Sequence, residues 1–366
     1  MIKRICFITT GLGMGGAEKQ VCDLADSFYK KGISVIIISL YGEPINTPNN
    51  PHIKIYSLKS KKSLLSIFKV YLKCSRIIKK FNPDIVHSHM FHANIFARML
   101  RMISRFPILI CTAHSTIEGG WGRMTMYRMT DMLATLSTNV SSEAVSSFEN
   151  KGAVKRGHMV VMNNGIDTGY YHYSTKYRNL KRKELNLDSD DVLLLAVGRL
   201  TEAKNYPNML SAFNLIKTQK NVHLAIIGVG EKESELKAIA KIMRNSDKIH
   251  WLGLRHDVRE WMSAMDIYVM SSSWEGMPLV LCEAMSCSGF VIATDCGGVT
   301  EIVADVGLVV PKESPEKLSI AITQAIDSEQ YKNEDLKSKA RQRIINNFSI
   351  DTVTNKWLDI FEKYTK

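Results

Sequence analysis

The sequence has no apolar stretch long enough to cross a membrane. Charged residues interrupt every apolar segment before it reaches the roughly 18–20 residues that a transmembrane helix needs. A short apolar run follows Lys3 and Arg4. It passes into a glycine loop without the small-residue cleavage region of a signal peptide. We therefore predict that this run is a first buried strand.

The sequence also lacks paired cysteines, internal repeats and low-complexity tracts. Its seven Cys are scattered and none forms a C-x-x-C pair, a pattern that indicates neither a disulfide framework nor a zinc cluster. We expect reduced thiols and a cytoplasmic protein. At 366 residues and 45% hydrophobic content, the chain is long enough for two globular domains.

Acidic residues are scarce in the first half. Residues 1–174 carry 22 Lys and Arg against 10 Asp and Glu, which accounts for the whole net charge of +12. The basic residues recur at helical spacing over 61–80 and again near 100, at Lys69, Lys73, Arg76, Lys80, Arg98, Arg101 and Arg105. Two interpretations remain open: a solvated helix face, or attraction to an anionic membrane or a pyrophosphate-bearing lipid. No stacking or groove-reading motif supports nucleic-acid binding.

Short apolar runs alternate with helical segments along the chain, which predicts parallel βαβ units. Strands are expected at 5–9, 34–40, 85–87, 108–111, 192–197, 222–227, 249–251, 267–270, 290–293 and 308–310. Helices are expected at 17–31, 64–80 and 351–364. We predict an α/β fold with two doubly wound, Rossmann-like domains that face a central cleft. The expected divisions are an N-terminal domain over 1–170, a linker over 171–191, a C-terminal domain over 192–348, and an amphipathic helix over 349–366 that packs back on the first domain.

A glycine loop follows the first predicted strand. Gly11, Gly13 and Gly16 satisfy G-x-G-x-x-G between a strand and a helix, as in dinucleotide-binding proteins. The ribose-binding acid expected about 20 residues later is not cleanly supplied. The loop therefore predicts only the close approach of a ligand's phosphate or sugar to the backbone.

The second half has two candidate phosphate-binding segments. Arg199 and Lys204 follow the strand at 192–197, where a planar guanidinium and a compact ammonium could stabilise a diphosphate leaving group. Glu275 precedes a turn that feeds a helix, and Glu283 lies about two helical turns further on. Two acids that accept hydrogen bonds from hydroxyls, with free backbone N–H groups between them, suit a nucleotide sugar. An ordinary surface helix with an N-terminal acid is the alternative.

Three histidines and an acidic pair are candidate metal ligands. His87, His89 and His114 follow neighbouring predicted strands, and Asp188 and Asp190 form a D-x-D pattern in the predicted linker. We favour histidines that line a cleft and bind hydroxyls, with a core position equally open for His87, over zinc binding. No metal is expected at either place.

These residues together resemble glycosyltransferase family 4, whose members have the GT-B fold. The resemblance covers nearly the whole chain. It rests on Gly15-Gly16-Ala17-Glu18, His114, Asn164-Gly165-Ile166-Asp167, Gly198-Arg199 with Lys204-Asn205, Gly228-Val229-Gly230, Glu275-Gly276-Met277-Pro278 through Glu283, and Thr294-Asp295-Cys296-Gly297-Gly298 with Glu301.

The resemblance implies a role for each matching residue. Arg199 and Lys204 would bind the donor diphosphate, Glu275 the hydroxyls of the donor sugar, and Glu283 the ribose. Gly16 would lie near the donor phosphates. Backbone groups of the donor site would come from Gly276, Met277, Pro278, Leu279 and Val280. The acceptor-side candidates are Gly15, His87, His89 and His114.

The resemblance also implies the reaction: metal-independent, retaining transfer of a hexose or N-acetylhexosamine. The implied donor is a nucleotide sugar, for which we expect UDP. The expected acceptor is a hydroxyl of an undecaprenyl-diphosphate-linked glycan, as in bacterial O-antigen, capsule or exopolysaccharide synthesis, with the protein peripheral on the cytoplasmic membrane. A sugar-nucleotide epimerase, a phosphorylase, a noncatalytic nucleotide-sugar-binding protein and an NAD-dependent oxidoreductase remain alternatives.

Overall fold

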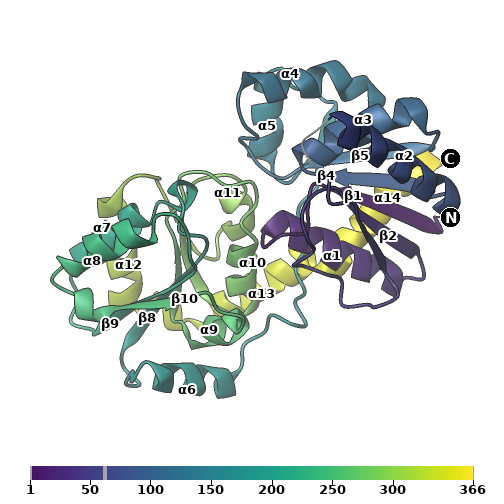
Figure 1. Ribbon diagram of the computed structural model, residues 1–366. Helices are drawn as coiled ribbons and strands as arrows, with labels where there is room; N and C mark the ends of the chain where they lie inside the picture. Colours follow the sequence, from purple (N-terminus) through teal and green to yellow (C-terminus); the bar gives the residue numbers. More distant parts are fainter. Residues whose placement is uncertain (1, 61–63, 366) are drawn as a thin grey trace. The chain divides into compact units, whose positions relative to one another are not determined.

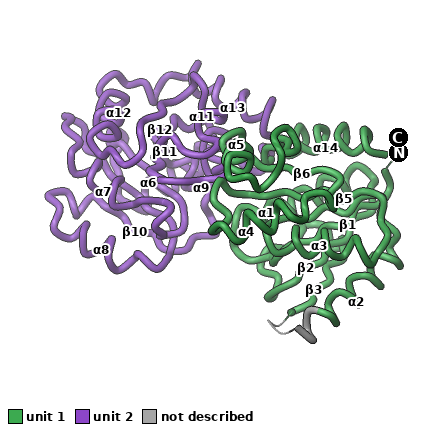
Figure 2. The backbone as a smooth tube through the Cα atoms, turned by 90° about the horizontal axis from the view of Figure 1, so that it is seen from above, with its two compact units in different colours: residues 1–166, 349–366 green, residues 167–348 purple. Residues whose placement is uncertain are grey.

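The computed structural model describes residues 2–60 and 64–365, which form two compact units. Unit 1 comprises residues 1–166 and 349–366, and unit 2 comprises residues 167–348 (Figure 2). Each unit is an α/β layered structure around one parallel sheet (Figure 1). No helix in the described part of the chain is long and apolar enough to cross a membrane.

Unit 1 contains a seven-stranded sheet in the order β3-β2-β1-β4-β5-β6-β7, with every pair parallel. Its strands are β1 (Arg4–Thr9), β2 (Ser34–Ser39), β3 (Lys54–Ser57), β4 (Ile85–His89), β5 (Ile108–Ala113), β6 (Leu136–Asn139) and β7 (Met159–Val161). β1, β4 and β5 are buried along nearly their whole length, as expected for strands covered on both faces.

The helices of unit 1 cover both faces of this sheet. They are α1 (Gly16–Lys30), α2 (Leu64–Phe81), α3 (Phe91–Ile103), α4 (Trp121–Thr130), η1 (Asp131–Leu133), α5 (Ser142–Asn150) and α14 (Ile350–Thr365). One core forms between the sheet and α1 with α14, and a second between the sheet and α2 with α3. Residues 61–63 of the basic segment predicted over 61–80 lie outside the described residues.

The C-terminal helix α14 belongs to unit 1, although the chain reaches it only after completing unit 2. Trp357 and Phe361 are almost fully buried against α1, and the Phe361 ring lies 5.6 Å from that of Phe28. The hydroxyl of Thr354 donates a hydrogen bond to Ser27. α14 is therefore part of the hydrophobic core.

Unit 2 contains a six-stranded parallel sheet in the order β10-β9-β8-β11-β12-β13. Its strands are β8 (Val192–Val197), β9 (Val222–Ile227), β10 (Ile249–Gly253), β11 (Ile267–Met270), β12 (Phe290–Thr294) and β13 (Leu308–Val310). Its helices are α6 (Thr175–Glu184), η2 (Glu202–Lys204), α7 (Tyr206–Leu215), α8 (Glu233–Lys241), η3 (Ser246–Lys248), α9 (Val258–Ala264), α10 (Leu279–Ser286), α11 (Val299–Val303), α12 (Pro315–Asp327), η4 (Gln330–Lys332) and α13 (Glu334–Phe348).

The predicted linker over 171–191 is not a free connection. It contains α6, which packs on α9, and Arg182 on α6 donates a hydrogen bond to Asp266. The change of units falls at residues 166 and 167, earlier than the predicted end of the first domain at 170. The segment looked irregular because α6 is short and highly charged, and it is held by ion pairs to residues some 80 positions away.

Candidate active site

Each sheet has one point where the connections leave in opposite directions. In unit 1 this point lies between β1 and β4, and in unit 2 between β8 and β11. Ligands of open α/β sheets bind at such points, beside the carboxyl ends of the strands. In unit 1 the glycine loop follows β1, His87 and His89 lie at the carboxyl end of β4, and His114 follows the neighbouring strand β5. In unit 2 Arg199 and Lys204 follow β8, and Glu275 follows β11.

The glycine loop of unit 1 connects β1 to α1. α1 begins at Gly16, and Gly15 occupies the capping position in extended conformation. A Cβ atom on Gly15 would lie 2.3 Å from a carboxylate oxygen of Glu18, so that carboxylate folds back over the loop. The side-chain amide of Asn46 holds the carbonyl of Gly13. These contacts fix the conformation of the loop, and Gly16 is exposed.

His87, His89 and His114 form a stack at the ends of β4 and β5. His87 is fully buried, with its Nε2 2.8 Å from the hydroxyl of Thr112. The Nδ1 of His89 lies 2.9 Å from the Nε2 of His114. Burial lowers the pKa of His87 to about 3 and that of His114 to about 4. The three imidazoles are therefore neutral near pH 7.

Of these histidines, His114 is half-buried, whereas His87 and His89 are buried in the core. The ring of His87 packs at 4.5 Å from the indole of Trp357 on α14. We expected His87 and His89 to line a cleft or, for His87, to occupy the core, and the core position is the one observed. His114 is the histidine of the three that remains partly exposed.

A buried carboxyl that no sequence motif marks supports the His114 loop. One oxygen of Glu118 accepts a hydrogen bond from the backbone N–H of His114, and the other accepts one from the hydroxyl of Tyr127 at 2.6 Å. Burial raises the pKa of Glu118. The sequence shows a Glu four residues after the histidine, but this spacing belongs to no motif that would mark Glu118 as part of the site.

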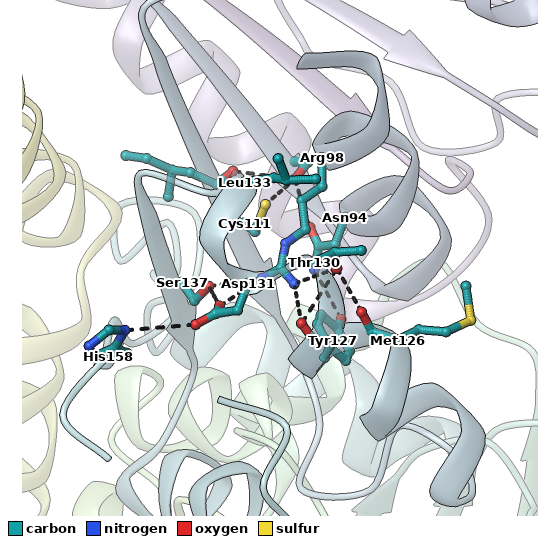
Figure 3. A network of polar contacts seen from close by, with 12 residues as sticks. Asn94, Arg98, Cys111, Met126, Tyr127, Thr130, Asp131, Leu133, Ser137 and His158 are labelled. Atoms are coloured by element: carbon teal, nitrogen blue, oxygen red, sulfur yellow. Dashed lines mark hydrogen bonds and ion pairs between the residues drawn. The ribbon is translucent and has the colours of Figure 1, made fainter. Parts of the chain in front are cut away.

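Arg98, which we expected on an exposed basic stripe, is fully buried (Figure 3). Its guanidinium donates hydrogen bonds to the carbonyl of Tyr127 and the hydroxyl of Ser137, and forms an ion pair with Asp131 at 3.3 Å. This network joins α3 to α4, η1 and β6, so Arg98 is a structural residue. Arg101 is half-buried and binds the carbonyls of Leu133 and Pro107.

In unit 2, Lys204 and Glu275 meet at the carboxyl ends of β8 and β11. The ammonium of Lys204 donates to Oε1 of Glu275 at 2.5 Å, and the hydroxyl of Ser272 donates to the same oxygen at 2.7 Å. Asn205, in left-handed conformation, caps α7 and donates to Ser273. Ser272 thus holds the carboxylate of the ion pair, and Asn205, the residue after Lys204, connects the loop after β8 to the loop after β11.

Glycines allow the loops after β8 and β9 to pack against each other. A Cβ on Gly228, whose φ is +147°, would lie 1.9 Å from the carbonyl oxygen of Gly198, and one on Gly230 would lie 2.3 Å from that of Leu200. Gly198 lies against the Lys204 side chain and accepts a hydrogen bond from the hydroxyl of Tyr206. Arg199, the next residue, is exposed.

The predicted phosphate segment is the turn that precedes α10. Gly276, Met277 and Pro278 are buried, and α10 begins at Leu279, with Pro278 in the capping position. Gly297 approaches this turn closely, since a Cβ there would lie 2.6 Å from the carbonyl oxygen of Glu275. Glu283 on α10 is 5% exposed. The N-terminus of α10 thus stands beside the Lys204–Glu275 pair.

No group of three or more His, Cys, Asp or Glu among residues 2–60 and 64–365 is placed to hold a metal ion. Within the D-x-D segment, Asp188 donates its backbone N–H to Asp191, and Asp191 also binds the amide of Asn221. The acidic segment therefore serves in local structure.

Two family models match almost the whole chain. The model described as "Glycosyltransferase Family 4" matches residues 14–170, and "Glycosyl transferases group 1" matches residues 178–343. The boundary between the matches falls close to the boundary between the two units.

Relatives and solved structures agree with the family models. The amylovoran biosynthesis glycosyltransferase AmsD of Erwinia amylovora is 26% identical over 98% of this chain and 99% of that protein. The UDP-Gal:α-D-GlcNAc-diphosphoundecaprenol α-1,3-galactosyltransferase of Escherichia coli is 26% identical over 83% of this chain and 80% of that protein. The crystal structure of Anabaena HepE in complex with UDP-glucose has a TM-score of 0.84 at 19% identity and covers 98% of this chain and 99% of that one. The two parallel sheets and the two family models, with the relatives that agree with them, make this chain a GT-B glycosyltransferase of family 4.

Proposed function

We propose that the protein transfers a hexose or N-acetylhexosamine from a UDP-sugar, with retention and without a metal ion, to a hydroxyl of an undecaprenyl-diphosphate-linked glycan. The single observation that carries the donor site is the Lys204–Glu275 pair beside the N-terminus of α10. It combines a cation for a diphosphate, a carboxylate for sugar hydroxyls and backbone N–H groups for an anion.

In the proposed reaction the acceptor hydroxyl attacks the sugar on the same face from which the diphosphate leaves. The departing diphosphate oxygen accepts the hydroxyl proton, so no protein nucleophile is needed. Lys204, exposed Arg199 and the first N–H groups of α10 stabilise the negative charge that develops on the diphosphate. Glu275 orients the sugar, and Glu283 binds the ribose. His114 lies on the acceptor side, where its neutral imidazole accepts or donates a hydrogen bond to a sugar hydroxyl.

The relatives support the choice of substrates. The printed name of the E. coli relative gives a UDP-galactose donor and a diphosphoundecaprenol-linked acceptor, and the HepE structure holds UDP-glucose. A relative from Campylobacter jejuni is named as an N-acetylgalactosaminyltransferase acting on a diphospho-undecaprenol acceptor. These names cover both sugar classes that we propose for this chain, and those of the E. coli and C. jejuni relatives share the undecaprenol carrier.

The charge and exposed apolar surface of unit 1 support docking on an anionic membrane. Large apolar side chains are exposed on its helices α2 to α4 and on η1, at Phe68, Leu72, Met99, Met102, Ile103, Trp121, Met126, Met129 and Met132. Exposed cations accompany them at Lys69, Lys73, Arg76, Lys80, Arg105, Arg123 and Arg128. Apolar side chains of this kind insert into the membrane interface. Each cation near an anionic surface adds about 1 kcal/mol of attraction.

The donor proposal is tested by thermal shift in EDTA with UDP, GDP, ADP and NAD. We expect UDP to stabilise the wild-type protein, and Lys204→Ala and Glu283→Ala to lose that stabilisation. Lys339→Ala is the matched control, because Lys339 lies in an exposed ion pair on α13. Stabilisation by NAD alone, or undiminished UDP binding in Lys204→Ala, would contradict the proposed donor site.

The membrane proposal is tested by flotation with phosphatidylglycerol vesicles at low and high salt. We expect the wild-type protein to float at low salt and the double variant Trp121→Ser/Met129→Ser to float less. Ile242→Ser, at an exposed position of unit 2, serves as the control. An unbound wild-type protein at low salt would refute membrane docking.

A further inference from the structure

A small cavity opens in unit 1 between α2, α3 and α4, at the carboxyl end of β2. Its volume is about 160 Å³. The cavity is lined by Leu40, Tyr41, Ser60, Val70, Tyr71, Phe91, His92, Ile95, Phe96 and Met126. The cavity lies entirely within unit 1.

The walls of this cavity are mostly hydrocarbon. The rings of Tyr71 and Phe96 stack with their centroids 4.3 Å apart, and none of the described residues that line the cavity carries a carboxylate, an ammonium or a guanidinium group. A dry apolar cavity of about 150 Å³ accommodates a molecule the size of benzene. The cavity therefore suits a branched, unsaturated hydrocarbon group of about five carbons. Met126 at its rim is 44% exposed, so the cavity is accessible from the apolar outer face of α4.

The inner end of the cavity adjoins the glycine loop. The backbone N–H of Tyr41 donates to the carbonyl of Thr10, and a Cβ on Gly11 would lie 3.3 Å from the carbonyl oxygen of Tyr41. The hydroxyl of Thr10 also accepts a hydrogen bond from the N–H of Ala93 on α3. A ligand whose hydrocarbon end fills the cavity would thus carry its polar end toward the edge of the sheet where the sugar-transfer residues of this unit lie.

Cations stand beside the cavity. Lys69 and Lys73 are exposed on the turn of α2 that contributes Val70 and Tyr71 to the wall. Arg76 and Lys80 lie further along the same helix, toward the amino ends of the strands, so Lys69 and Lys73 are the cations of this row nearest the carboxyl edge of the sheet. An uncharged lipid would gain no binding free energy from this row of cations, and a sugar would gain none from the apolar cavity. An isoprenoid diphosphate uses both.

We propose that this cavity binds the isoprene units nearest the diphosphate of the lipid-linked acceptor, while the basic row of α2 attracts that diphosphate. The inference rests on the proposed function and adds a specific binding site for the carrier within unit 1. It makes the carrier lipid a recognised part of the substrate, in addition to its role in holding the acceptor at the membrane.

The test compares farnesyl diphosphate with inorganic pyrophosphate by calorimetry in vesicle-free solution, at concentrations where farnesyl diphosphate is monomeric. We expect the wild-type protein to bind farnesyl diphosphate about tenfold or more tightly than pyrophosphate, because the farnesyl tail buries hydrocarbon in the cavity. Ile95→Trp fills the cavity from α3 and should reduce this advantage to about threefold or less. Val70→Phe fills it from α2 and provides a second variant should the first fail to fold.

Ile320→Trp is the matched control. It makes the same Ile-to-Trp change at an exposed position of α12 in unit 2 that does not line the cavity, and it should keep the full advantage of the farnesyl group. Equal binding of the two diphosphates by the wild-type protein would overturn the proposal. A farnesyl advantage that survives both cavity-filling substitutions would also overturn it, because the tail would then bind elsewhere.

Binding and transfer separate this inference from the proposed function. Loss of the farnesyl advantage on filling the cavity supports the lipid site, even if the sugar acceptor proves to be different from the one proposed. Transfer to an undecaprenyl-diphosphate-linked glycan that is unaffected by Ile95→Trp would support the proposed function and overturn the lipid site.

Discussion

At the scale of single residues, the candidate donor site depends on one ion pair. Lys204 and Glu275 are both mostly buried, and Ser272 binds the same carboxylate oxygen as the lysine. The sequence identified both charged residues because each follows a strand that meets the other at one edge of the sheet. It did not identify Ser272 or Glu118, since a hydroxyl or a carboxyl beside a loop has no distinctive spacing.

Replacing either member of the pair should reduce turnover far more than stability. We expect Lys204→Ala and Glu275→Gln each to lower kcat by about 100-fold or more, since fixed charges aimed at developing charge are worth several kcal/mol. Initial rates with a competent acceptor measure the effect, and circular dichroism checks the fold. The double variant should cost little more than the single ones, because each leaves the other member without its partner. Full activity in either single variant would refute the assigned roles.

The buried histidines predict that unit 1 loses stability in mild acid. Burial lowers the pKa of His87 to about 3, whereas an unfolded histidine has a pKa near 6.5. Between these values the unfolded chain binds the proton and the folded protein does not, so the free energy of unfolding falls as the pH drops below about 6.5. The expected slope is up to about 1.4 kcal/mol per pH unit for each such group.

Urea unfolding of the wild-type protein and His87→Asn between pH 7 and 5 measures this slope. The variant should be less stable at pH 7 but should lose less stability on acidification. Equal slopes in the two proteins would show that His87 is not held neutral. Carboxyl groups contribute little to the difference above pH 5, because their unfolded pKa values lie near 4.

At the scale of elements, most strands of both sheets could be predicted from apolar runs, and β8, β9, β11 and β13 have the predicted bounds. The strands β3, β6 and β7 were not predicted. β6 is Leu-Ser-Thr-Asn, and its polar side chains are buried and hydrogen-bonded, as in the contact between Thr138 and Thr112. A sequence shows that a residue is polar but not that a partner 26 positions away will satisfy it.

Arg98 gives the same lesson for a helix. Its spacing from Arg101 suggested an exposed stripe, yet its partners Asp131 and Ser137 lie 33 and 39 positions further along the chain. The burial of this arginine depends on α3, η1 and β6 coming together, which a helical pattern in one segment cannot reveal. The remaining cations of the predicted basic pattern lie at the surface or, for Arg101, partly buried.

The loops after β8 and β9 should tolerate no side chain at Gly228. We expect Gly228→Ala to displace the Gly198–Arg199 backbone, because the new Cβ would lie 1.9 Å from the carbonyl oxygen of Gly198. Since this backbone supports Lys204, affinity for UDP should fall by about tenfold or more, along with stability.

Gly157→Ala is the matched control. Gly157 lies in unit 1 and also has a positive φ of +77°, but its Cβ would meet no atom within 4 Å. It should therefore cost stability through backbone strain alone and leave the affinity for UDP unchanged. Calorimetric titration with UDP distinguishes the variants, and equal affinities would show that contact at Gly198 does not shape the donor site.

At the scale of the whole molecule, the chain leaves unit 1 after residue 166 and returns to it at residue 349. The backbone N–H of Ile350 donates to the carbonyl of Ile166, and Ser349 pairs with Ile166 in a short parallel bridge. The outgoing and returning segments are therefore side by side, and α14 completes the core that α1 begins.

Truncating the core residue of α14 should destabilise unit 1. We expect Trp357→Ala to lower the free energy of unfolding by about 3–5 kcal/mol, the usual cost of removing a buried aromatic side chain. Tyr364→Ala removes a 43% exposed ring from the same helix and should cost less than about 1 kcal/mol. Urea denaturation followed by circular dichroism measures both, and similar losses would contradict the packing of α14.

The late return of the chain also sets an order of events during synthesis. Unit 2 is one continuous segment, so all its residues have been translated before α14 begins. Unit 1 precedes unit 2 in the chain, but it lacks the helix that buries its α1 face until α14 has been translated and has left the ribosome. The usual order, in which the N-terminal domain finishes folding first, is therefore reversed here. Unit 1 of the nascent chain stays incompletely folded while unit 2 is translated.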